Sequence, residues 1–138
     1  MTQQKRDPFF QVLENRLCPF LFERGYKLIG TEFCSSSFGN CLAYFEKSAW
    51  IIRIVRDRDQ HFIEFCSSVD CDICVDLSRV IDYASDSPLK VSMQFDLEVL
   101  TTLLIEWLEK IEVLLSEQGV SGLADNVWAF VSQHAPLY

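Results

Sequence analysis

Basic residues are scarce in this chain of 138 residues, which holds 12 Lys and Arg against 20 Asp and Glu and has a formal net charge of −8. That balance disfavours a polyanionic partner, so we expect no nucleic-acid binding. Long apolar runs are also lacking. The most apolar later run, residues 99–105, includes two threonines and is much shorter than the roughly 18 residues of a membrane span. The first residues are polar and do not resemble a signal peptide, and we therefore predict a cytoplasmic protein with no membrane contact.

Glycine and histidine are few, and neither forms a pattern typical of catalysis. The five glycines are scattered and form no phosphate-binding loop. The two histidines, His61 and His134, lie outside every metalloprotease motif, and the chain has no serine-nucleophile elbow. We therefore predict a non-enzymatic protein without a cofactor.

Apolar residues are abundant and make up 49% of the chain. A chain of this length buries about 68–70% of the surface that it exposes when unfolded, which is enough for one ordinary core. Residues 1–138 are accordingly predicted to form a single domain.

Apolar residues recur at three- and four-residue steps in four segments, which predicts helices. The first helix spans residues 7–24, with Asp7 as its N-cap, Pro8 as its first residue and a kink near residues 17–18 caused by Pro19. The C-terminal half is predicted to hold two or three more helices, over residues 75–84, 95–117 and 121–134, with a stop at Gly119.

Short apolar and β-branched runs lie between these helices and predict four strands, over residues 26–34, 41–46, 50–56 and 62–67. Their connections are too short for parallel crossovers, so the strands form an antiparallel meander. The predicted fold is α+β, with an N-terminal helix, a four-stranded sheet and C-terminal helices packed on one face. Apolar residues also fall on the other face, which leaves a homodimer open.

Three cysteines form the sharpest local pattern, Cys66-x4-Cys71-x2-Cys74. Three thiolates at this spacing suit a metal site with a fourth ligand from elsewhere, or a redox pair of Cys71 and Cys74. Small buried apolar side chains explain the same residues. Nearby carboxylates oppose thiolate formation, and a reducing compartment favours free thiols. Metal or thiol-redox chemistry at these cysteines is therefore the alternative function and not the main one.

The excess of acidic over basic residues is confined to the second half of the chain. Residues 1–60 hold nine Lys and Arg against seven Asp and Glu, whereas residues 61–138 hold three against thirteen. An acidic surface steers a basic partner and accelerates its association. We therefore predict a protein-binding module, with an immunity or regulatory role, whose acidic C-terminal half engages a basic protein. The predicted partner-binding residues are Asp70, Asp72, Asp76, Arg56 and Arg58.

A family resemblance rests on three segments of the first half. They are Ser37-Phe38-Gly39-Asn40, Ala43-Tyr44-Phe45-Glu46, and Ile52-Arg53-Ile54-Val55-Arg56-Asp57-Arg58-Asp59-Gln60 with Phe62-Ile63-Glu64. Over about residues 9–82 the chain resembles small bacterial proteins of unknown function, some of them similar to immunity proteins of contact-dependent toxin systems. The resemblance implies a binding role, although these motifs also fit a structural hairpin, and the segment from Cys66 to Cys74 departs from the family pattern.

Overall fold

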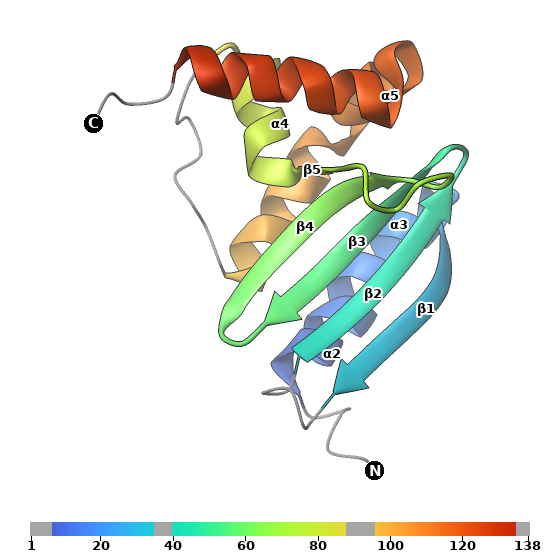
Figure 1. Ribbon diagram of the computed structural model, residues 1–138. Helices are drawn as coiled ribbons and strands as arrows, with labels where there is room; N and C mark the ends of the chain where they lie inside the picture. Colours follow the sequence, from blue (N-terminus) through green and yellow to red (C-terminus); the bar gives the residue numbers. More distant parts are fainter. Residues whose placement is uncertain (1–6, 35–39, 88–95, 135–138) are drawn as a thin grey trace.

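The computed structural model describes residues 7–34, 40–87 and 96–134, and these form an α+β architecture. A helical N-terminal segment precedes a five-stranded sheet, and two helices follow it (Figure 1). The bounds are α2 Pro8–Val12, η1 Leu13–Leu17, α3 Cys18–Glu23, β1 Lys27–Cys34, β2 Asn40–Lys47, β3 Trp50–Asp57, β4 Gln60–Ser67, β5 Cys74–Asp76, α4 Leu77–Ala84 and α5 Leu97–Gln133.

The N-terminal segment is one continuous helix whose middle, η1, is a π-helical turn. Pro19 has no backbone N–H to donate to the preceding turn, and a locally widened helix is a common response to such a break in the hydrogen-bond ladder. The irregularity therefore falls where the kink was expected, because the π-helical turn ends at Leu17. Gly25, with a φ of 90°, follows the end of α3 and lets the chain turn into the sheet.

The sheet is an antiparallel meander in the order β1-β2-β3-β4-β5. Its two tightest turns place Ser48 and Arg58 at positive φ, 57° and 62°. The predicted four strands were one too few. Residues 74–76 pair with β4 as β5. The last of them, Asp76, is also the N-cap of α4, and its carboxylate accepts from Ser78 N at 3.0 Å. The helix predicted from residue 75 therefore starts at Leu77.

The C-terminal helix α5 runs over 37 residues and changes direction at Gly119, whose φ of 72° is not helical. The helix end predicted at Gly119 coincides with this change of direction. The two helical segments meet there directly, without the break predicted between residues 117 and 121. In the part of the chain that the structure describes, no helix combines the length and the apolar character needed to cross a membrane.

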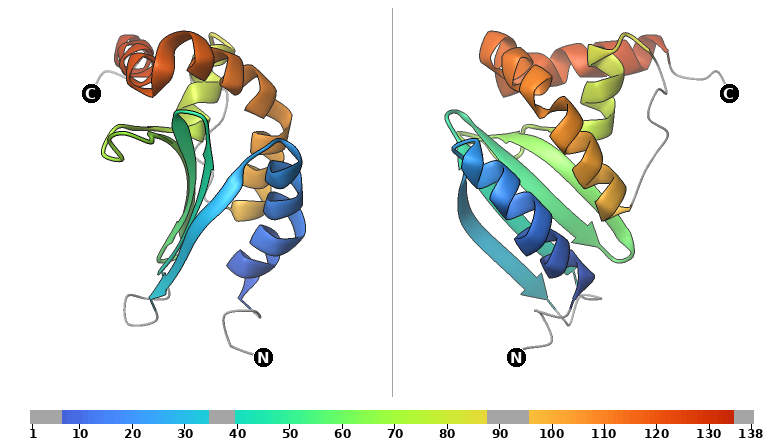
Figure 2. Two further views of the ribbon diagram at one scale, coloured as in Figure 1. Left: turned by 90° about the vertical axis from the view of Figure 1, so that its right-hand side faces the viewer. Right: turned by 180° about the vertical axis from the view of Figure 1, so that it is seen from behind.

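One face of the sheet is covered by the N-terminal helix and the first part of α5, whereas α4 and the last part of α5 lie beyond one end of the strands (Figure 2). The prediction that the C-terminal helices all pack on one face was thus too simple. Alternate strand residues fill the core beneath the helices. They are Cys41, Ala43, Phe45, Ile52, Ile54, Ile63 and Phe65. The opposite face carries an ion pair between Arg53 and Glu64, with 2.8 Å between Nη2 and Oε1.

Candidate functional site

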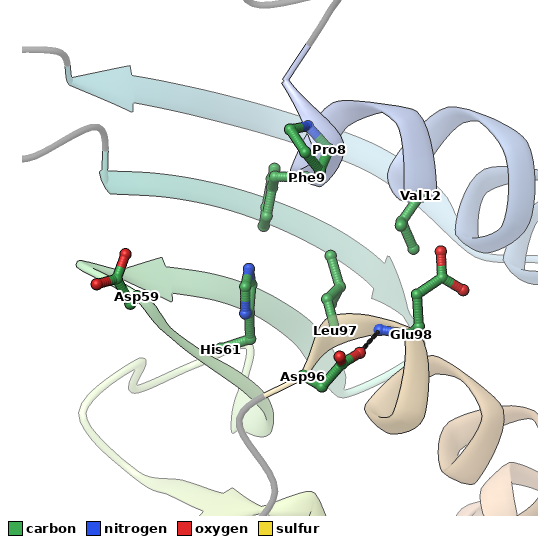
Figure 3. A pocket seen from close by; sticks show the side chains of 8 residues that line it. All are labelled: Pro8, Phe9, Val12, Asp59, His61, Asp96, Leu97 and Glu98. Carbon is green, nitrogen blue, oxygen red and sulfur yellow. Dashed lines mark hydrogen bonds between the residues drawn. The ribbon is translucent and has the colours of Figure 1, made fainter.

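A pocket opens where α2, the β3–β4 turn and the start of α5 meet (Figure 3). Its volume is about 430 Å³, within the range typical of small-ligand sites. Four lining residues are apolar, three carry carboxylates and one is a histidine. They are Pro8, Phe9, Val12, Leu97, Asp59, Asp96, Glu98 and His61.

The first wall is the start of α2, which Asp7 fixes in place. The Asp7 carboxylate accepts from Phe9 N at 2.9 Å and caps the helix. Arg56 of β3 donates to both oxygens of the same carboxylate, with 2.7 Å between Nη2 and Oδ2. The hydrogen bond from Arg56 is the main reason why the pKa of Asp7 lies below its usual value. A single carboxylate therefore both begins the helix and binds it to the sheet.

The floor of the pocket is apolar and includes two stacked rings. Phe9 is only 1% exposed, and its ring lies parallel to the imidazole of His61, with 6.4 Å between the centroids and 12° between the planes. His61 reaches this place because it lies opposite Arg56 in the β3–β4 register. Leu97, at the start of α5, completes the apolar surface.

Carboxylates form the rim around this floor. Asp96 is the N-cap of α5 and accepts from Glu98 N at 2.8 Å and Val99 N at 3.2 Å. Glu98 is 61% exposed and forms an ion pair with Arg16 over 2.7 Å. Asp59 lies at the other end of the pocket, beyond His61, on the β3–β4 turn (Figure 3). An apolar floor below several carboxylates suits a ligand group with an aliphatic stem and a cationic head.

The predicted partner-binding residues do not form one surface. Arg56 is engaged with Asp7, and Arg58 lies in the neighbouring turn, where its backbone N donates to Asn40 Oδ1 at 2.7 Å. Asp70 and Asp72 are exposed on the loop after β4, at the other end of that strand. A strand of eight residues separates the two groups by about 23 Å.

Asp76, the fifth predicted residue, lines a second groove of about 480 Å³ between β5, α4 and the last part of α5. Trp128 lies in the same groove and is 72% exposed. Burial raises the pKa of Asp76, whose carboxylate also caps α4. This residue therefore supports the fold, although it remains at the edge of a surface with an exposed aromatic ring.

The three cysteines of the sequence pattern divide into a pair and a separate residue. Cys66 and Cys74 lie directly opposite each other on β4 and β5, whereas Cys71 is exposed on the loop between them. Within residues 7–34, 40–87 and 96–134, no three His, Cys, Asp or Glu side chains are placed to hold a metal ion. The cysteine spacing thus brings two thiols together across a hairpin.

Sequence reasoning missed the pocket because its lining comes from three distant segments. Asp96 and Glu98 belong to a helix start, and Asp followed by an apolar helical run is a recognisable N-cap signal. The meeting of that helix start with the first turn of α2 is a tertiary contact, which periodicity does not reveal. The Asp7–Pro8 start, by contrast, was predicted and is confirmed.

Comparisons with known proteins give no relative for this chain. No family model matches it, and neither a curated protein nor a solved structure does.

Proposed function

We propose that this chain is a non-enzymatic protein-binding module that engages a basic protein through the pocket between α2, the β3–β4 turn and the start of α5. The observation that carries the proposal is the rim of three carboxylates, Asp59, Asp96 and Glu98, over an apolar floor. An immunity or regulatory role fits this chemistry, because such proteins act by occupying another protein. The sequence resemblance to small bacterial proteins of unknown function, some of them similar to immunity proteins, supports the same role.

The group that best fits the pocket is a lysine or arginine side chain of the partner. Its methylene stem would lie against the apolar lining of the pocket, which includes the exposed Pro8. Its charged head would meet Asp59, and it would share the carboxylates of Asp96 and Glu98 with their present partners, the first amides of α5 and Arg16. Arg56, which lies 5.8 Å from the centre of the Phe9 ring, already binds Asp7, so its charge is balanced at the site.

Charge outside the pocket would bring such a partner to it. Residues 61–138 hold thirteen Asp and Glu against three Lys and Arg. Helix α5 carries several of these acidic residues at exposed positions, among them Glu106, Glu109, Glu117 and Asp125. A surface of one sign accelerates the encounter with an oppositely charged protein, and salt screens this effect.

Two double variants with the same change in net charge test the proposal. Asp59→Asn with Glu98→Gln removes two rim carboxylates, and Glu109→Gln with Glu117→Gln removes two exposed carboxylates elsewhere on α5. Each form would be used at low and high salt to capture partners from the source cell. We expect a basic protein to be retained at low salt by the wild type and the α5 variant, and to be lost from the rim variant.

Equal capture by the rim variant would contradict the role of the pocket. The lack of any salt-sensitive basic partner would contradict the proposal as a whole. Circular dichroism of both variants would establish that they fold, which we expect because all four side chains are exposed.

The alternative function uses Cys66, Cys71 and Cys74. Its metal form requires three or more converging ligands, and the described residues hold no such group. The pairing of Cys66 with Cys74 across β4 and β5 favours a thiol-redox form that uses these two residues in place of the predicted pair of Cys71 and Cys74.

A further inference from the structure

Cys66 and Cys74 lie opposite each other at a position of the β4–β5 hairpin that suits a disulfide. Ser67 N donates to Ile73 O at 3.0 Å, so the next pair, Cys66 and Cys74, is not hydrogen-bonded through its backbone. In such pairs the Cα atoms are typically about 4.5 Å apart and the side chains are close. Disulfides join Cα atoms about 4.4–6.8 Å apart, so no strand movement is required.

The two thiols differ in their surroundings. Cys66 faces Cys74 across the strand pair and is only 2% exposed. Cys74 is half-buried and lines the same groove as Trp128. Arg53 Nη2 donates to Cys74 Sγ at 3.4 Å and places positive charge beside this sulfur. Cys74 is therefore the accessible member of the pair and Cys66 the enclosed one.

The neighbouring thiols are less suited to oxidation. The Cys74 thiol donates to the backbone oxygen of Cys71 at 3.0 Å, so Cys71 meets Cys74 through its main chain. Cys41 lies opposite Phe33 and Arg56 in its strand pairs, and not opposite a cysteine. Burial raises the pKa of Cys66 as well as those of Cys18 and Cys41, so the first attack falls to Cys74 and not to any of these three thiols.

We propose that Cys66 and Cys74 form a thiol–disulfide exchange site whose oxidant is a small disulfide such as oxidised glutathione. Cys74 loses its proton to solvent and attacks one sulfur of glutathione disulfide, which breaks that bond and releases one glutathione thiolate. The Cys66 sulfur then attacks Cys74 Sγ in the mixed disulfide and releases the second thiolate. The protein loses two electrons and two protons, and the oxidant becomes two glutathione thiols.

Oxidation would change the acidic loop as well as the thiols. The bridge closes the loop of residues 67–73, which carries Asp70 and Asp72, and a covalent link reduces the freedom of such a loop. It also replaces the thiol to which Arg53 now donates. The redox state of the pair would therefore alter the end of the sheet farthest from the pocket.

Exposure of the full chain to glutathione buffers of increasing oxidised fraction tests this assignment. Free thiols are alkylated after equilibration, and peptide mass mapping identifies any bridge. We expect the loss of two thiols per chain and one bridge, Cys66 to Cys74. The Cys71→Ser variant should form the same bridge to the same extent.

The Cys66→Ser variant should stop at the mixed disulfide of Cys74 with glutathione, because it lacks the second thiol. A bridge between Cys71 and Cys74 would overturn the assignment, as would a wild-type chain that keeps all its thiols in the most oxidising buffer. If Cys66→Ser fails to fold, the bridge mapped in the wild type and in Cys71→Ser decides between these outcomes.

Discussion

The two ends of the sheet attach helices to strands with different chemistry. At the pocket end, an ion pair between Asp7 and Arg56 binds the start of α2 to β3. At the opposite end, the Tyr26 hydroxyl accepts from Trp50 Nε1 at 2.9 Å and donates to Glu112 Oε2 of α5 at 2.8 Å. Lys47 Nζ donates to the same Glu112 oxygen at 3.1 Å.

This difference bears on where a ligand would bind. The polar network around Tyr26 joins residues of the strand ends to α5 and is part of the packing between them. At the pocket end, the ion pair stabilises one wall, while the carboxylates of Asp59, Asp96 and Glu98 remain around a hollow. The number of carboxylates matters less than their placement, because Asp70 and Asp72 lie on an exposed loop without a comparable apolar floor.

The largest effect is expected from Asp7→Ala. The change removes the cap of α2 and leaves the Arg56 guanidinium without its carboxylate, so we expect the free energy of unfolding to fall by about 3 kcal/mol. Asp7→Asn keeps a capping oxygen and should lose less. Urea denaturation of the three proteins measures the difference, and a loss below about 1 kcal/mol for Asp7→Ala would contradict the role given to the ion pair.

Tyr26→Phe tests the opposite end and should have a smaller effect. Without the hydroxyl, the buried indole N–H of Trp50 loses its acceptor, which costs about 1–2 kcal/mol. Tyr44→Phe is the matched control, because that hydroxyl bonds Glu32 on the other face of the sheet at 3.3 Å. Equal losses of unfolding free energy in the two variants would show that the Tyr26 hydroxyl contributes no more to stability than the hydroxyl of Tyr44.

The pH dependence of stability separates the two ends further. Asp7 has a lowered pKa, so its contribution is present above the pKa of the unfolded chain and is lost as the pH falls through the lower folded value. We expect the wild type to lose stability below about pH 4, and Asp7→Asn to lose less over the same range. Urea titrations at several pH values measure this slope.

Asp76, two residues after Cys74, contributes to the stability of the fold with the opposite pH dependence. Its raised pKa stabilises the fold below the unfolded pKa, and this contribution is lost as the pH rises through the folded value. The lesser acid sensitivity of Asp7→Asn is therefore the specific signature of Asp7. Parallel curves for the variant and the wild type would contradict it.

The smallest effect is expected from Val69→Ser on the loop between β4 and β5. Val69 is 93% exposed, so its replacement should change the free energy of unfolding by no more than about 0.5 kcal/mol. Differential scanning calorimetry is sufficient to detect a larger change. A clear destabilisation would mean that Val69 makes a stabilising contact in the folded protein, contrary to its exposure.

Local sequence signals predicted the elements better than their arrangement. The Asp7–Pro8 cap, the irregularity near Pro19 and the turn at Gly119 each depend on one or two neighbouring residues, and the structure has them where they were expected. Strand β5 was missed because three residues are too few to show a period. The strand forms by pairing with β4, and local propensity does not encode such a contact between strands.

The candidate site was less predictable than the fold. The redox pair predicted from the sequence was Cys71 and Cys74, which are three residues apart, yet the hairpin register places Cys66 opposite Cys74. The acidic residues were read as one surface, whereas β4 separates Asp70 and Asp72 from the pocket. Charge counts locate an excess along the chain, but only the tertiary structure places each carboxylate.

The central claim is that the pocket receives a cationic side chain, and a nuclear magnetic resonance titration tests it most directly. The probe is Nα-acetyl-arginine amide, and its neutral counterpart is Nα-acetyl-citrulline amide. We expect the arginine probe alone to shift the backbone amide signals of His61, Leu97 and Glu98, and we expect the Asp59→Asn, Glu98→Gln variant to lose this response. Equal shifts with the neutral probe, or shifts confined to the loop of Asp70 and Asp72, would contradict the claim.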